Sequence, residues 1–93
     1  LIFRSAASAE MRRIAGSTKA QWGKHQARHY TEQLRDQIKS LREFPNRFPE
    51  VEEHPGLHQM RCDQHLIFYR VSDDEIEIVQ ILRVARDIDN RLE

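Results

Sequence analysis

Apolar residues recur at helical spacing through the first half of the chain. They occupy positions 7, 11, 14, 15 and 22, with Thr18 in the same stripe, and then, after a short interval, positions 27, 30, 34, 38 and 41. Steps of three and four residues keep such side chains on one face of a helix. The pattern therefore predicts two amphipathic helices, and the short interval between them predicts an antiparallel helical hairpin.

Residues at the ends of these two segments support the same boundaries. Ser5 is suited to cap the N-terminus of the first helix, and Gly23 is suited to end that helix in a left-handed conformation. Pro45 cannot continue a helix, so the second helix is predicted to end near Phe44. A short β-prone stretch, residues 1–3, precedes the first helix.

The second half of the chain changes to the period of two that is typical of strands. Residues 57–62 alternate loosely, residues 65–71 are rich in β-branched and aromatic side chains, and residues 75–84 alternate again. Turn residues at 72–74 separate the last two segments, so these strands are predicted to be antiparallel neighbours. One side of the last strand is predicted to hold Ile76, Ile78 and Leu82.

The remaining segments complete a predicted fold. Residues 45–53 are predicted to be a connecting loop and Pro55-Gly56 a turn, while the polar tail 85–93 is compatible with a short helix. The element order is then β-α-α-β-β-β, an α+β fold in which a helical hairpin packs on one face of a mainly antiparallel sheet. The 93 residues fit one domain, residues 1–93. The core is predicted to combine strand aliphatics with Trp22, Tyr30, Leu34, Ile38, Leu41 and Phe68.

Charge narrows the classes of function. The chain has 15 basic and 15 acidic residues, and this balance argues against a protein that binds phosphate backbones or anionic membranes as a whole. Its longest apolar run has four residues, far short of the roughly 20 that a membrane span needs. Residues 1–44 nevertheless carry +5 and residues 45–93 carry −5. Such a split suits two faces with different partners, although composition alone favours a solvated surface with scattered charge.

Metal and thiol chemistry have weak support. His25 and His29 have the i, i+4 spacing that can place two imidazoles on one metal, but Arg28 lies between them. The Glu of the zinc-protease motif is also missing, so an exposed helix surface is favoured over a metal site. Cys62 is the only cysteine, which excludes an internal disulfide and fits a reducing cytosol. No metal or cofactor is therefore expected.

A basic cluster on the predicted strands is the most interesting group. Its members are Arg61, His65, Arg70 and Arg83. Guanidiniums with an imidazole suit charge stabilisation and proton transfer on an RNA phosphate. The same side chains suit the acidic groups of a partner, or cross-strand pairs with Asp63, Glu75 and Glu77. The spacing favours pairing and partner binding over catalysis.

Four segments, in this order, resemble the ParE branch of the RelE/ParE toxin superfamily. They are Trp22-Gly23-x-x-Gln26-Ala27-x-x-Tyr30, Pro55-Gly56-Leu57 with Arg61, the strand 65–71, and Ile76-Glu77-Ile78-Val79-x-Ile81-Leu82 followed by Arg86-Asp87. The resemblance covers nearly the whole chain, and its fold is the β-α-α-β-β-β order predicted above. It implies the cytoplasmic, growth-inhibiting toxin of a bacterial type II toxin–antitoxin module, which forms a hetero-oligomer with a ParD-like antitoxin.

The superfamily includes ParE-like poisons of DNA gyrase and RelE-like mRNA endonucleases that act on the ribosome. The zero net charge and a tail without His or Tyr favour the gyrase poison, which is not an enzyme and reads no nucleic-acid sequence. For such a toxin the charge pattern predicts an antitoxin surface with Arg12, Arg13, Lys19, Arg61 and Arg70, although many relatives are acidic where Arg12 and Arg13 stand. Target contacts are expected from the tail, with Arg83, Arg86 and Asp87. The alternative nuclease would use Arg61, His65 and Arg83, the last replacing a His of many relatives. An inactive relative that only binds its antitoxin is a third hypothesis.

Overall fold

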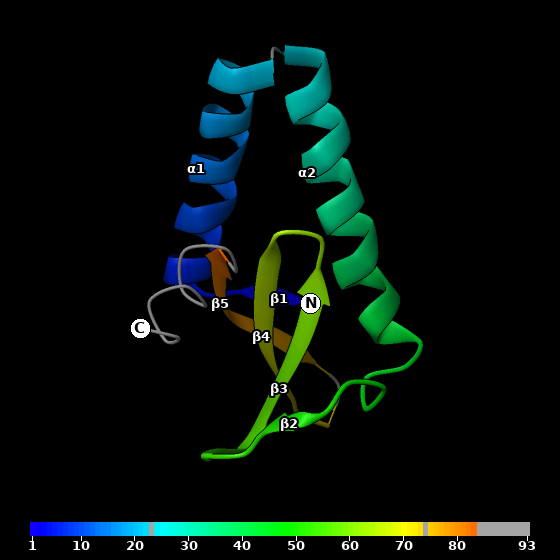
Figure 1. Ribbon diagram of the computed structural model, residues 1–93. Coiled ribbons are helices and arrows are strands. Elements are labelled where there is room, and N and C mark those ends of the chain that lie inside the picture. The colour runs from blue at the N-terminus through cyan, green and yellow to red at the C-terminus, as the bar shows by residue number, and fades with distance from the viewer. Residues whose placement is uncertain (23, 74, 84–93) are drawn as a thin grey trace.

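The computed structural model describes residues 1–22, 24–73 and 75–83. Two long helices, α1 (Ser5–Trp22) and α2 (Lys24–Lys39), form a hairpin, and a 3-10 turn at Ser40–Arg42 follows α2. The strands are β1 (Ile2–Phe3), β2 (Glu50–Val51), β3 (His54–Cys62), β4 (His65–Val71) and β5 (Ile76–Arg83). Figure 1 shows the hairpin rising beside the sheet, with the end of α1 and the beginning of α2 farthest from the sheet.

The five strands form one sheet in the order β1-β5-β4-β3-β2. β1 runs parallel to β5, and the three other pairs are antiparallel. The predicted α+β fold is therefore confirmed, with one strand more than the sequence indicated. We call the face covered by the helices the inner face and the opposite face the outer face.

The core lies between the helices and the inner face of the sheet. From the helices it takes Ala7, Met11, Ile14, Leu34, Ile38 and Leu41. From the strands it takes Met60, Cys62, Ile67, Tyr69, Ile76, Ile78 and Ile81. The helical stripes read from the sequence are confirmed at Ala7, Met11, Ile14, Leu34, Ile38 and Leu41. Ala15 and Tyr30, also in the stripes, are partly buried. The side chain of Trp22, also predicted in the core, lies outside the described residues.

The N-terminal cap of α1 differs from the prediction. The helix begins at Ser5 itself, and the amide of Ser8 donates to the carbonyl of Arg4 at 2.9 Å. Arg4 therefore occupies the cap position, because strand β1 runs directly into the helix. Arg4 also extends the β1–β5 pairing, since its amide donates to the carbonyl of Ile78 at 2.9 Å.

The region predicted to be a loop and a turn contains an edge hairpin. Glu50 and Val51 form β2, and Pro55-Gly56 lies inside β3 rather than between elements. The register shifts within β2, which pairs Glu50 with His58 but Val51 with His54. The residues of β3 between His54 and His58 therefore form a bulge in the β2–β3 pairing. Bulges and edge strands are the places where a sheet accepts proline. The bulge also accommodates Gly56, whose φ is 86°.

A second irregularity corrects the face of one β5 residue. Phe68 pairs with Gln80 whereas Tyr69 pairs with Ile78, so Val79 is an extra residue in the ladder. Beyond this bulge the alternation is reversed: Ile81 is buried and Leu82 lies on the outer face, opposite to the prediction. Phe68, predicted in the core, is half-buried on the outer face because it alternates with Ile67 and Tyr69.

Candidate functional site

The sheet register divides the predicted basic cluster between two faces. Arg61 pairs with Leu66, whereas Cys62 pairs with His65, which in turn pairs with Arg83. Residues that pair across strands point to the same face. His65 and Arg83 therefore belong to the inner face, and Arg61 belongs to the outer face. The three residues of the alternative nuclease set are not brought together.

Arg61 and Arg70 lie at opposite ends of the outer face. The Arg61 Nε donates to the carbonyl of Asp63 at 3.2 Å, within the β3–β4 turn. Arg70 pairs in register with Leu57 and Glu77, and its guanidinium lies over Gly56 of the bulged strand. Between these two exposed arginines the face carries the half-buried apolar side chains of Leu57, Leu66, Phe68 and Leu82. It also carries two glutamines, Gln59 and Gln80, which pair in register with Phe68 on its two sides.

His65 lies where α2 meets the β3–β4 turn, and it is only 6% exposed. Its Nδ1 is 2.6 Å from the hydroxyl of Tyr30, with the two rings tilted at 51°. Burial lowers the pKa of His65, partly opposed by the charge of Glu10. Burial also raises the pKa of Tyr30 to about 12, with a further contribution from Asp63. At neutral pH the pair is therefore a neutral phenol and a neutral imidazole, and it joins helix to sheet with the imidazole buried.

A groove between the two helices includes one of the predicted binding residues, Arg12. It encloses about 360 Å³, and its lining comes from Phe3 of β1, from Ser8, Met11, Arg12 and Ala15 of α1, and from Thr31 and Arg35 of α2. The floor is thus mainly apolar, and two exposed guanidiniums, Arg12 and Arg35, stand at its rim. Arg12 was among the predicted contacts but Arg35 was not, because the charge of α2 alone does not reveal which of its arginines faces α1.

The neighbouring arginines of α1 differ in what they contact. Arg13 makes a forked ion pair with Glu10, through three contacts of 2.7 to 3.0 Å, and this pair raises the pKa of Arg13. Within the parts of the chain that the structure covers, Arg12 and Arg35 have no ion pair. Of the two predicted antitoxin contacts on this turn of the helix, only Arg12 offers an uncommitted charge.

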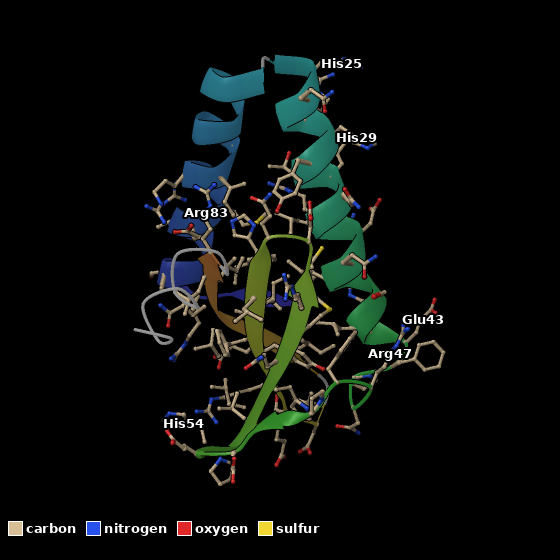
Figure 2. The ribbon with its side chains drawn as sticks, viewed as in Figure 1. His25, His29, Glu43, Arg47, His54 and Arg83 are labelled. Atoms are coloured by element: carbon tan, nitrogen blue, oxygen red, sulfur yellow. The ribbon has the colours of Figure 1, made fainter. Side chains whose placement is uncertain are left out.

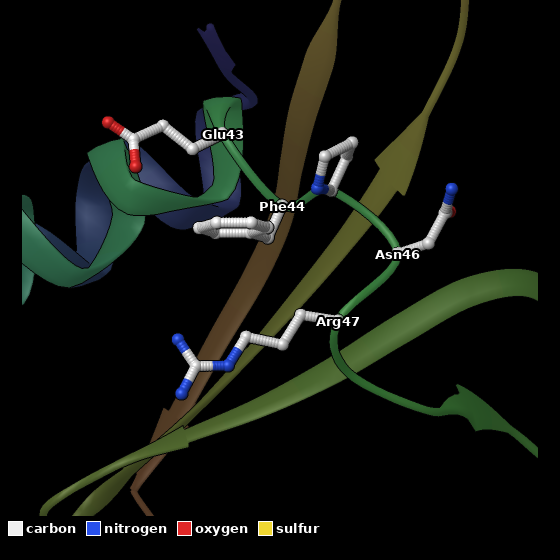
Figure 3. Close-up of a pocket in the computed structure, with 5 residues that line it drawn as sticks. Glu43, Phe44, Asn46 and Arg47 are labelled. Atoms are coloured by element: carbon white, nitrogen blue, oxygen red, sulfur yellow. The ribbon is translucent and has the colours of Figure 1, made fainter.

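A shallow hollow lies in the loop after the 3-10 turn. It encloses about 580 Å³ and is lined by residues 43–47, of which Phe44 is 59% exposed (Figure 3). The guanidinium of Arg47 lies 5.4 Å from the ring centre of Phe48. No pattern in the sequence indicated this hollow, since the prolines there predict only a chain break.

The described residues contain no candidate metal-binding site. No group of three His, Cys, Asp or Glu side chains there is arranged to hold an ion. His25 and His29 are exposed on α2 (Figure 2). Burial raises the pKa of Cys62, with Asp63 adding to the shift, so this thiol is poorly disposed to react. No helix in the described ranges is long and apolar enough to cross a membrane.

Three further predicted contacts cannot be placed. Arg86 and Asp87 lie outside the described residues, as does the predicted C-terminal helix. Lys19 belongs to α1, but its side chain is not described.

The whole arrangement matches a known family of toxins. Residues 1–88 match the family model of the ParE toxin of the type II toxin–antitoxin system parDE. The chain belongs to the ParE toxin family. It is 30% identical to the toxin ParE1 of Mycobacterium tuberculosis over 94% of this chain and 91% of that one. It is 31% identical to the toxin ParE of Escherichia coli over 98% of this chain and 90% of that one.

Solved structures agree with this family assignment at the level of the fold. The chromosomal ParDE system of P. aeruginosa contains a chain with a TM-score of 0.78 and 24% identity, over 88% of this chain and 91% of that one. The RelB–RelE antitoxin–toxin complex of Methanococcus jannaschii gives a TM-score of 0.60 and 11% identity, over the full length of both. The predicted membership of the RelE/ParE superfamily is confirmed, and the ParE branch is confirmed with it.

Proposed function

We propose that this ParE-family toxin inhibits DNA gyrase in the cytoplasm and is neutralised by a ParD-like antitoxin. Family membership over nearly the whole chain supports a role as toxin, and the resemblance of its motifs to gyrase poisons supports the target. The observation that carries the choice is the division of the basic cluster by the sheet. His65 is buried and hydrogen-bonded to Tyr30, and Arg61 lies on the other face of the sheet. The described residues therefore contain no assembled acid–base set for RNA cleavage.

The experiment is a supercoiling assay with purified gyrase and relaxed plasmid. The full chain is expected to stop supercoiling and to leave cleaved DNA attached to gyrase after denaturation. Arg83→Gln at the exposed end of β5 is expected to weaken inhibition, whereas Arg47→Gln in the distant loop is the matched control. Normal supercoiling at a large excess of toxin, together with normal growth on expression without antitoxin, would favour an inactive relative instead.

The inter-helix groove is the proposed seat of the antitoxin. Its apolar floor fits the nonpolar face of an amphipathic segment, and Arg12 and Arg35 fit acidic side chains on the edge of that segment. Disordered antitoxin segments gain such contacts when they fold on the toxin. Arg61 and Arg70 remain proposed secondary contacts, since they lie on the outer face, away from this groove.

Single charge removals test the groove. Arg12→Gln and Arg35→Gln are each expected to lower antitoxin affinity about five- to tenfold at low salt, because each ends a pairing that the free toxin does not make. Arg13→Gln is the control, since its charge is already held by Glu10, and its expected effect is less than about twofold. Equal losses for all three variants, measured by titration calorimetry at two salt concentrations, would show that only overall charge matters.

The RNase alternative keeps one supporting observation. His65 and Arg83 are register partners on one face, an imidazole beside a guanidinium. An in vitro translation reaction distinguishes the two activities: codon-specific mRNA cuts that disappear in Arg83→Ala would establish the nuclease, and intact mRNA would exclude it.

A further inference from the structure

The outer face of the sheet presents two amides with an aromatic ring between them. Phe68 of β4 pairs in register with Gln59 of β3 on one side and with Gln80 of β5 on the other. Side chains that pair in this way have Cβ atoms about 4.5–5.5 Å apart. We call these three residues the amide row. Both helices pack on the inner face, so neither of them covers this row.

The side chains of the amide row are accessible to another molecule. Gln80 is exposed, and Gln59 and Phe68 are half-buried. Within the part of the chain that the structure describes, the side-chain amide of neither glutamine forms a hydrogen bond. The fold therefore does not use these two amides, and each can both donate to and accept from a ligand.

Two exposed arginines stand on either side of the amide row. Arg70 pairs with Leu57, and Arg61 lies four residues farther along β3. The two arginines are therefore about 13 Å apart along the strands, with the amide row midway between them. Neither forms an ion pair in the described ranges, and Glu77, the register partner of Arg70, is instead paired with Arg4 at 3.3 Å. Both charges are thus available to an anionic ligand.

Shape and chemistry together select the class of ligand. A nucleobase has a face that stacks on aromatic rings and an edge that forms hydrogen bonds with amides. Phe68 with an amide on each side matches both features, and the two arginines match the phosphates that flank a stacked base. An acidic peptide would contact the arginines but would gain little from a ring between amides. In a duplex the base faces are covered by neighbouring bases, so a single strand fits this surface better.

The apolar neighbours of the amide row favour DNA over RNA. Leu66 and Leu82 pair in register beside the row and are half-buried, so they offer carbon surface to the sugar and base of a bound strand. The thymine methyl group and a deoxyribose bury well against such surface. The 2′-hydroxyl of RNA instead needs a polar partner when it is buried.

We propose that the outer face of the sheet binds single-stranded DNA without requiring a defined sequence. One base stacks on Phe68 between the two amides, and Arg61 and Arg70 hold the phosphates on either side of it. This binding goes beyond the inhibition of gyrase and does not depend on it. The neutral charge of the whole chain argued against binding to phosphate backbones, but two unpaired arginines beside a stacking ring suit a weak contact of this kind.

The test measures binding of the full chain to a fluorescent thymidine strand by anisotropy, across a range of salt concentrations. A strand of about 12 nucleotides lies within the range of known single-strand sites. F68L keeps an apolar side chain but removes the ring. F44L makes the same change at a distant, exposed phenylalanine and is its matched control.

A second pair of variants tests the charges at exposed positions. R61Q/R70Q removes both charges of the outer face, and K39Q/R42Q removes two exposed charges near the end of α2 as its matched control. Circular dichroism checks that every variant is folded.

The wild-type chain is expected to bind the thymidine strand at low salt. F68L should weaken binding about tenfold and leave the salt dependence unchanged, because stacking releases no counterions. R61Q/R70Q should reduce the slope of log affinity against log salt by about 1.4, or about 0.7 for each lost phosphate contact. Both controls should keep most of the affinity.

Three competing ligands test the class of molecule. A duplex of the same length, a uridine strand and poly-glutamate are each expected to bind more weakly than the thymidine strand. Equal affinity for the duplex or for poly-glutamate would mean that charge alone attracts the ligand, and tighter binding of the uridine strand would make the ligand RNA. Any of these results, no binding by the wild-type chain, or equal losses in a variant and its control would overturn the proposal.

Discussion

The inner face of the sheet and the solvent-exposed side of the helical hairpin differ in whether their polar side chains have partners. On the inner face of the sheet, polar side chains are buried with partners: His65 with Tyr30, and His58, whose Nδ1 is 2.9 Å from the carbonyl oxygen of Phe48. Among the buried side chains described there, none has a polar atom without a hydrogen bond. On the side that faces solvent, Arg12, Arg28 and Arg35 have no ion pair within the described residues. The hydrogen-bonded histidines join parts of the fold, whereas arginines without an ion pair can bind acidic groups of another molecule.

The largest expected effect sharpens this comparison within one strand. Ile78 is fully buried on the inner face, whereas Leu82 is half-buried on the outer face. Ile78→Ala should reduce the free energy of unfolding by about 2–5 kcal/mol, because it removes contacts and leaves a cavity. Leu82→Ala should cost less than about 1.5 kcal/mol, since solvent already reaches that site. Urea denaturation of both variants measures the difference, and similar losses would contradict the register beyond the bulge.

A smaller effect is expected at the link between helix and sheet. Tyr30→Phe removes the hydroxyl that contacts His65 Nδ1 and leaves a largely buried nitrogen without its partner. The expected loss is about 1–3 kcal/mol of unfolding free energy. Ser40→Ala is the control, because its hydroxyl donates to the carbonyl of Gln37 in an exposed position, and its loss should stay below about 0.5 kcal/mol. Equal losses in thermal denaturation would mean that the Tyr30–His65 link adds no stability.

The same link predicts a dependence of stability on pH. The pKa of His65 is lowered in the folded protein, so the unfolded chain binds the proton more readily. Its contribution is fully present above the unfolded value, about 6.5, and is lost as the pH falls from there through the folded pKa. His65→Gln should therefore flatten the decline in stability between pH 7 and 5. Urea midpoints at several pH values measure this, and an unchanged slope would assign the decline to other groups.

The smallest predicted effect concerns the exposed side and has the opposite sign. Gly16 lies inside α1, is exposed, and a Cβ there would meet no atom within 4 Å. Gly16→Ala should stabilise the protein by about 0.5–1 kcal/mol, because alanine loses less conformational freedom in a helix. Differential scanning calorimetry detects such a gain. A loss of stability would show that the exposed side of α1 is more closely packed than the structure indicates.

The helices and the general fold followed from the sequence because their signals are local. A helix repeats its apolar positions every three to four residues whatever it packs against, so Leu34, Ile38 and Leu41 were placed correctly in the core. Turn residues and strand-forming runs also act locally, and they predicted the antiparallel pair β4–β5. The family motifs extended the same linear information to the ParE assignment, which the comparisons confirmed.

The wrong predictions concern features that depend on pairing with a neighbouring strand. One extra residue, Val79, reverses the faces of Ile81 and Leu82, and no pattern along β5 marks that position as a bulge. Pro55-Gly56 resembles a turn in sequence but lies in a strand, because the register shift opposite β2 accommodates it. The β2 strand itself has only two residues, too short to show a period.

The sequence by itself determined the two helices, the order of the elements apart from the short strand β2, the membership of a toxin family, and the concentration of cations between Glu10 and Glu32. Only the tertiary structure decided which charges are committed. Arg12 and Arg13 are adjacent in the sequence, yet one stands at the rim of a groove and the other is held by Glu10. Arg61 and His65 are four residues apart, yet a two-residue turn and the alternation of the strands place them on opposite faces of the sheet. Periodicity is a property of one segment, whereas a site depends on the register between segments.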